Sequence, residues 1–208
     1  FPKAEGFQDV MDAMAALYAE KHDFETLVVD SLDWLEPLVW AETVRRNNVA
    51  NPSKPWASIE DAGYGRGFVA TLDVWREYLD AINALRNDKG MAVIQTAHAE
   101  VKRFDSPETE PFDRYQIKLH KLASALVQEH ADMVLFANFK TSVTRTDVGM
   151  KKVVRGVGAG TRALYTEERP AFLAKNRHNL PSELPLSWEA LASAMAASSA
   201  AARTSEAA

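Results

Sequence analysis

Residues that could bind a polyphosphate stand at the end of a predicted strand near the start of the chain. The run Thr26-Leu-Val-Val-Asp30-Ser31 is typical of a buried parallel strand that ends in an acid and a hydroxyl. Open α/β sheets bind their ligands at this end of their strands. Asp30 is therefore a candidate ligand for Mg²⁺ through a bound water, with Ser31 beside it. The alternative is that Asp30 is only a helix N-cap or a turn residue.

A second predicted strand also ends in polar side chains. Met91-Ala-Val-Ile-Gln95-Thr96-Ala-His98 places Gln95, Thr96 and His98 where they could contact a phosphate or an attacking water. A histidine at a strand end can equally be a satisfied structural residue. Direct metal binding by the histidines is not expected, because they lack ligand spacing such as HxxxH.

Two groups of cations follow strands further along. Lys102 and Arg103 precede Phe104, and charge next to an aromatic ring suits single-stranded nucleic acid. A solvated loop is the alternative. Lys175 and Arg177, one residue apart, could project together toward a phosphate, and on a neighbouring subunit they could act as arginine-finger groups. Taken alone, that tripeptide is nearly uninformative.

The glycines of Gly156-Val-Gly158-Ala-Gly160-Thr161-Arg162 do not make a phosphate loop. The motif GxxxxGK[ST] needs a lysine before the hydroxyl and a helix behind it, whereas Arg162 and a β-type run follow Thr161. We predict a hairpin turn there. The same search finds no GxxxxGK[ST] in residues 1–208.

The wider pattern predicts a doubly wound α/β fold. Amphipathic helices are expected near 6–22, 31–46, 68–85 and 117–127, and Gly90 should end the third. Buried strands are expected at 26–30, 91–98 and 131–137, which gives the alternation of a mostly parallel sheet. Connecting segments over 47–67 and 100–114 are predicted to be loops.

The last third of the chain has a different pattern. Short β-type runs after Asn138, separated by Gly or Pro, predict antiparallel hairpins added to one edge. We predict one domain over residues 1–190. The Ala/Ser-rich residues 191–208 are expected to form a frayed helix or a flexible tail.

Composition limits the class of protein. The 208 residues are 47% hydrophobic and 25% charged, which suits one sizeable globular domain. A net charge of -5 opposes a broadly basic surface, so DNA contacts would come from local basic loops. The chain has no cysteine, which fits a cytoplasmic protein. It has no apolar run of transmembrane length, so no membrane partner is expected.

Together these segments resemble the RecA-like P-loop ATPases of phages, also called AAA-type phage nucleotide-binding proteins. Some of them are single-strand-annealing recombinases. The resemblance covers most of residues 1–190 and rests on these stretches in order: 26–36, 59–67, 91–98, 102–104, 113–121, 131–138, 174–177 and 184–188.

The resemblance implies a RecA-like core that binds ATP and Mg²⁺. Asp30 would be the Walker B acid and residues 95–98 the sensor strand. Residues 102–114 would be a mobile loop for single-stranded DNA, and Lys175 and Arg177 the cations acting in trans within a ring or filament. The family's P-loop lies upstream of Walker B, so we expect an N-terminally truncated chain that binds ATP poorly by itself.

Three functional hypotheses remain at this point. The first is an ATPase acting with single-stranded DNA in recombination or annealing, in the cytoplasm of a host bacterium. The second is a DNA-binding or assembly module that no longer hydrolyses nucleotide. The third is a generic α/β ligand-binding domain, which would hold if the resemblance were misleading.

Overall fold

The computed structural model describes residues 1–148 and 151–206, with side chains at 1–140 and 160–201. The chain divides into two compact units. One comprises Phe1–Glu100 and Gln116–His130, and the other comprises Val101–Tyr115 and Ala131–Ala208. The sequence had predicted one domain over residues 1–190.

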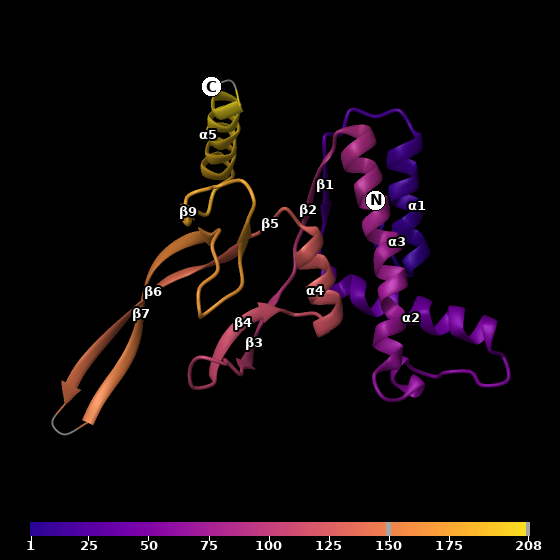
Figure 1. Cartoon of the computed structure of the whole chain (residues 1–208), viewed down its shortest axis with the longest axis horizontal. Helices are drawn as coiled ribbons and strands as arrows, with labels where there is room; N and C mark the ends of the chain where they lie inside the picture. Colours follow the sequence, from indigo (N-terminus) through magenta and orange to yellow (C-terminus); the bar gives the residue numbers. More distant parts are fainter. Residues whose placement is uncertain (149–150, 207–208) are drawn as a thin grey trace. The chain divides into compact units, whose positions relative to one another are not determined.

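The first unit is built mainly of helices, with a two-stranded sheet beside them (Figure 1). Gly90 ends the longest helix in the left-handed conformation, with φ of 68°, as the sequence predicted. The elements of the unit, in chain order, are α1 (Phe7–Ala19), β1 (Thr26–Val29), α2 (Leu32–Ala50), the 3-10 helix η1 (Ile59–Ala62), α3 (Arg66–Lys89), β2 (Ala92–Gln95) and α4 (Lys121–His130).

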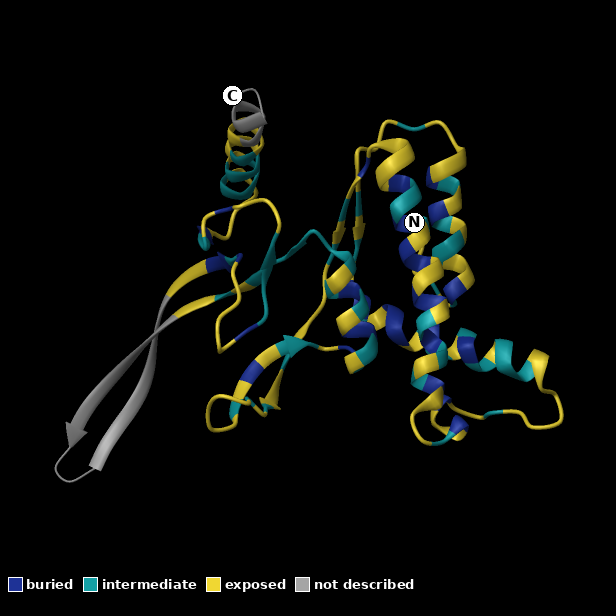
Figure 2. Cartoon of the chain, in the orientation of Figure 1, coloured by how far each residue is buried: buried dark blue, intermediate teal, exposed yellow. Residues whose placement is uncertain are grey.

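The core of this unit follows the apolar stripe of α3. Trp75 is 0% exposed, and α1, α2 and α4 all pack against the helix that carries it. Figure 2 shows the buried residues along these helices. The first turn of α3 also lies very close to η1. A Cβ added to Gly67 of α3 would be only 1.9 Å from the backbone oxygen of Ile59 in η1. The predicted helical stripe is therefore confirmed as the centre of the core.

The sheet of the first unit contains only β1 and β2, which pair in parallel with Thr26 opposite Ala92 and Val29 opposite Gln95. One face packs against the helices. The other is open, with Val28 55% exposed and Ile94 37% exposed. The prediction that both strands are fully buried was therefore wrong. A run of apolar residues does not say whether a second layer covers the sheet.

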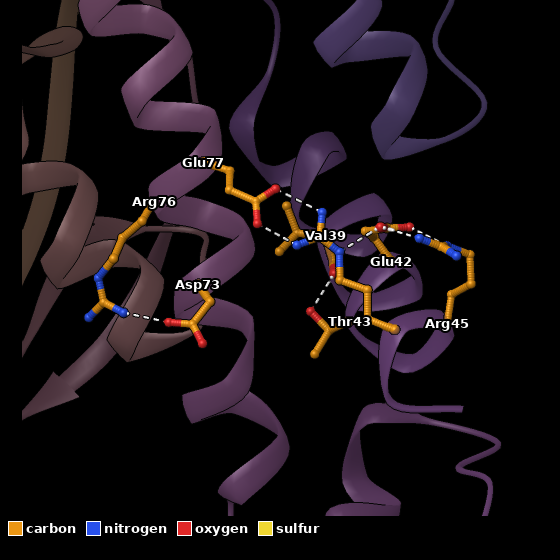
Figure 3. A network of polar contacts seen from close by, with 8 residues as sticks. Val39, Glu42, Thr43, Arg45, Asp73, Arg76 and Glu77 are labelled. Atoms are coloured by element: carbon orange, nitrogen blue, oxygen red, sulfur yellow. Dashed lines mark hydrogen bonds and ion pairs between the residues drawn. The ribbon is translucent and has the colours of Figure 1, made fainter. Parts of the chain in front are cut away.

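Ion pairs join α2 to α3 on the solvent side of the core (Figure 3). Arg46 of α2 contacts both Glu42 of its own helix and Glu77 of α3, and its Nη2 donates to Glu77 Oε2 at 2.8 Å. Hydrogen bonds from Arg45 and Arg46 outweigh the effect of partial burial and lower the pKa of Glu42 to about 2. The network fixes the helix that follows the candidate strand end.

A buried carboxylate ties α4 to α2. Glu36 is 7% exposed and accepts the backbone N–H of His120, the residue before α4, at 2.9 and 3.1 Å. The ring of His120 stacks on Phe68 of α3 with centroids 4.1 Å apart.

The second unit consists of β-ribbons and a terminal helix. Its aromatic side chains pack on one another, with the rings of Phe136 and Phe172 stacked 4.6 Å apart and Tyr165 4.8 Å from Phe172. The remaining elements of the chain are β3 (Ala99–Phe104), β4 (Phe112–Ile117), β5 (Met133–Val134), β6 (Phe136–Val148), β7 (Lys151–Tyr165), β8 (Lys175–Asn176), β9 (Glu183–Pro185) and α5 (Trp188–Glu206).

The pairing of these strands corrects the predicted parallel sheet. β5, within the predicted third strand, pairs antiparallel with β8 and does not join the parallel pair of β1 and β2. A short apolar run carries no signal for strand direction. Antiparallel pairing of β6, β7 and β9 agrees with the predicted hairpins.

One predicted loop is strand at both of its ends, with residues 105–111 between them outside any strand, and one predicted turn lies within a strand. The charged segment 100–114 contributes to the two-stranded sheet of β3 and β4, which tolerates polar residues because its faces need not be buried. The glycine run 156–160 lies inside β7 and is not a turn. Gly160, with φ of 70°, lies where the register with β6 shifts.

The Ala/Ser-rich end of the chain is helical from Trp188 to Glu206, where a frayed helix or a flexible tail was expected. Among the described residues, none of the helices combines the length and the apolar character needed to cross a membrane.

Candidate functional site

The carboxyl ends of β1 and β2 bring the first group of candidate residues together. Because the strands are parallel and in register, the residues that follow them lie side by side. The N–H of Thr96 donates to the Val29 carbonyl at 2.9 Å, and the N–H of Leu32 donates to the Thr96 carbonyl at 2.9 Å. The Thr96 hydroxyl donates to Asp30 Oδ1 at 2.7 Å. The peptide bond between Asp30 and Ser31 is cis.

The exposed carboxylate of Asp30 has room for a ligand. Oδ1 accepts the Thr96 hydroxyl, whereas no described side chain or N–H bonds to Oδ2. An exposed carboxylate oxygen at a strand end suits a Mg²⁺-bound water. The N-cap of α2 is Ser31, so Asp30 is not the cap that the alternative interpretation proposed. No group of three or more His, Asp or Glu side chains in the described residues could hold a metal directly.

A second carboxylate, Asp33 in the first turn of α2, binds His98. Its oxygens accept the His98 backbone N–H at 3.1 Å and the ring Nδ1 at 2.9 Å. The Ser31 hydroxyl donates to Asp33 Oδ1 at 2.7 Å. Asp33 has a side chain only 6% exposed, whereas that of His98 is 66% exposed. A buried anion therefore holds an exposed imidazole at the strand end.

These hydrogen bonds determine the charge of Asp33. Burial by itself would raise the pKa of its carboxyl, but the bonds from Ser31 and from the backbone and ring of His98 lower the pKa to about 2. Asp33 is consequently ionised at neutral pH, and it can only accept hydrogen bonds.

The side chain of Gln95 does not join the strand-end cluster, which consists of Asp30, Asp33, Thr96 and His98. Its Oε1 accepts the hydroxyl of Tyr78, a core residue of α3, at 2.9 Å. Burial raises the pKa of that tyrosine, so the hydroxyl stays protonated and remains a donor. Successive side chains of a strand point to opposite faces, which explains why Gln95 and Thr96 separate. Thr96 and His98, but not Gln95, join Asp30 in the cluster.

The basic residues predicted to bind DNA lie on β3, in the second unit. Lys102 and Arg103 are exposed, and Arg103 Nε donates to Asp105 at 3.3 Å. Phe104 is partly buried, with its ring 5.4 Å from that of Phe112 and beneath the guanidinium of Arg114 at 4.9 Å. The two cations are therefore accessible, while the aromatic ring already has neighbours.

Lys175 and Arg177 also lie in the second unit, at β8 and just beyond it. Lys175 Nζ donates to the Ala131 carbonyl at 2.7 Å, and Arg177 Nη1 contacts Asp132 Oδ1 at 3.2 Å. Both cations contact the segment that leads into β5. Their convergence with Asp30 on a phosphate stays a prediction.

Asp33 is the site residue that sequence reasoning missed. It lies 65 residues from His98, and no spacing rule links an acid in a helix to a histidine that far away. The available signal was local. An acid two residues after a strand-end hydroxyl, at the start of a helix, stands at the same end of the sheet as that strand's carboxylate.

Comparison with known proteins identifies a family. A family model described as AAA domain matches residues 1–178. No curated protein matches the chain. No solved structure matches it either.

Proposed function

Because the chain belongs to the AAA domain family, we propose that Asp30, Thr96 and His98 form part of a site that binds and hydrolyses ATP. The observation that carries the proposal is the exposed Asp30 carboxylate, oriented by the Thr96 hydroxyl at the carboxyl end of a parallel strand pair. Family membership makes a nucleotide the expected ligand. The geometry supports this end of β1 as the place where its metal-bound phosphates lie.

In this proposal each residue has a distinct role. Asp30 holds a water of the Mg²⁺ shell through Oδ2, and Thr96 keeps the carboxylate in place. Bound Mg²⁺ supplies positive charge against the phosphate oxygens. His98 lies at the same strand ends, where it can contact a phosphate oxygen or the attacking water. Ser31, also predicted at this site, is only 5% exposed and its hydroxyl already donates to Asp33, so it is not assigned a phosphate contact.

The wider proposal is an ATPase of phage type, RecA-like in its core, that acts on single-stranded DNA in recombination or annealing in the cytoplasm of a host bacterium. Support for the DNA contact comes from Lys102 and Arg103, which are exposed on the ribbon of β3. Self-association into a ring or filament would let Lys175 and Arg177 act on a neighbouring subunit's nucleotide.

The test replaces the carboxylate and keeps its shape. In the full-length protein, Asp30→Asn should weaken binding of a fluorescent ATP analogue in Mg²⁺ and lower ATP hydrolysis by on the order of a hundredfold, because the metal-bound water loses an anionic partner. Asp23→Asn is the matched control. It changes an exposed acid that precedes the same strand and that makes no hydrogen bond among the described residues.

Equal hydrolysis and equal Mg²⁺-dependent binding in Asp30→Asn and wild type would reject the site. Nucleotide binding that needs Asp30, together with the absence of hydrolysis in the wild type, would support the alternative of a non-hydrolysing DNA-binding or assembly module.

A further inference from the structure

Asp33 makes more hydrogen bonds to His98 than are needed to hold the end of β2 against the start of α2. The His98 backbone N–H, at 3.1 Å from Asp33 Oδ1, would by itself tie the end of β2 to the start of α2. The ring is held as well, through Nδ1 at 2.9 Å. Holding an exposed side chain in one rotamer costs conformational entropy, and a ring that is 66% exposed recovers little of it by burial.

The partner determines which ring nitrogen carries the proton. Asp33 is ionised at neutral pH and only accepts, so the Nδ1 of His98 must be the donor. In the neutral imidazole, Nε2 then bears the lone pair on the opposite side of the ring. No group in the described part of the chain bonds to Nε2.

We propose that Asp33 is a positioning residue, which holds His98 with Nε2 as the acceptor for the water that attacks the γ-phosphate. This inference rests on the proposed function, since it concerns the same strand ends as Asp30. A buried acid that orients an imidazole and stabilises its protonated form is an arrangement known to activate a nucleophile. Here the nucleophile would be water.

The step balances as a hydrolysis. The water oxygen forms a bond to the γ-phosphorus while the bond from phosphorus to the β–γ bridging oxygen breaks, and ADP leaves with that electron pair. The water's proton passes to Nε2 of His98, and the Asp33 carboxylate stabilises the resulting imidazolium. The proton then leaves to solvent, and inorganic phosphate is released.

Two measurements on the full-length protein test the role of Asp33. The first is the ¹⁵N long-range correlation spectrum of the His98 ring, which reports the tautomer without any nucleotide. Wild type should show Nδ1 protonated. In Asp33→Asn the amide can donate to Nδ1, so we expect a shift toward the tautomer with the proton on Nε2.

The second measurement is kinetic. Asp33→Asn should lower kcat for ATP by roughly tenfold to a hundredfold, while the Kd for a non-hydrolysable ATP analogue changes less than about twofold. His98→Ala should lower kcat similarly, and adding Asp33→Asn to it should cause no further loss. Asp9→Asn is the matched control, since Asp9 also accepts backbone N–H groups in the first turn of a helix, α1.

The possible results separate the two ideas. An unchanged tautomer in Asp33→Asn, or a further loss of kcat when it is added to His98→Ala, would overturn the positioning role. So would a loss of hydrolysis in Asp30→Asn with none in Asp33→Asn, and that result would leave the proposed function intact. No loss in Asp30→Asn would overturn the proposed function, and the inference with it.

Discussion

Asp33→Asn should reduce the loss of the free energy of unfolding that accompanies a change from neutral to acid pH. The pKa of Asp33 falls from 3.8 to about 2 in the folded protein, and its side chain is 6% exposed, so solvent screens it little. A difference of nearly two pKa units corresponds to about 2 kcal/mol. Because the folded pKa is lowered, this stabilisation is fully present above pH 4 and is lost as the pH falls toward 2.

Urea unfolding of wild type and Asp33→Asn at pH 7, 5, 4 and 3 measures the effect through tryptophan fluorescence. The difference in the free energy of unfolding should be largest at pH 7 and should shrink by about 1 kcal/mol or more by pH 3. Asp23→Asn measures the effect of removing an exposed acid. A difference that stays constant between pH 7 and pH 3, or grows in acid, would refute the assignment of Asp33 as a buried anion held by Ser31 and His98.

Two further predictions concern other parts of the chain. Gly67→Ala should destabilise the protein by about 1–3 kcal/mol, because the new Cβ would lie 1.9 Å from the Ile59 carbonyl oxygen. In Gly6→Ala the Cβ would meet only a side-chain oxygen at 4.0 Å, so a larger loss in that control during urea unfolding would contradict the packing described. Replacing both Lys102 and Arg103 by Ala should weaken binding to single-stranded DNA and reduce the dependence of log K on log salt by about 1.4, the slope expected for two phosphate contacts. An unchanged salt slope would exclude β3 as the DNA contact.

Local sequence patterns predicted the elements that carry the core. The stripe of α3 has an apolar residue every three or four positions, and Gly90 ends it where a left-handed residue is needed. Strands β1 and β2, which end at Val29 and Gln95, were also predicted, and their parallel direction follows from their connection through helices. The existence of each of these elements depends on residues close together in the chain.

Several features that depend on distant pairing were not predicted. Neither the direction of β5 nor the ribbon of β3 and β4 can be read from composition, because an antiparallel strand with solvent on its faces looks like a charged loop. The same holds for the site. Thr96 bonds to Asp30, whereas Gln95 bonds to Tyr78, a residue 17 positions away that no local pattern links to it.

The most direct test of the central claim is the paramagnetic effect of Mn²⁺-ATP on the backbone amide signals of the full-length protein. A four-residue strand such as β1 spans about 13 Å, enough to separate its two ends in this measurement. The amides of Ser31, Thr96 and His98 should broaden strongly while that of Asp23 stays sharp, and Asp30→Asn should abolish the difference. Equal broadening at both ends of the strand, or none at either, would contradict the placement of a nucleotide at Asp30.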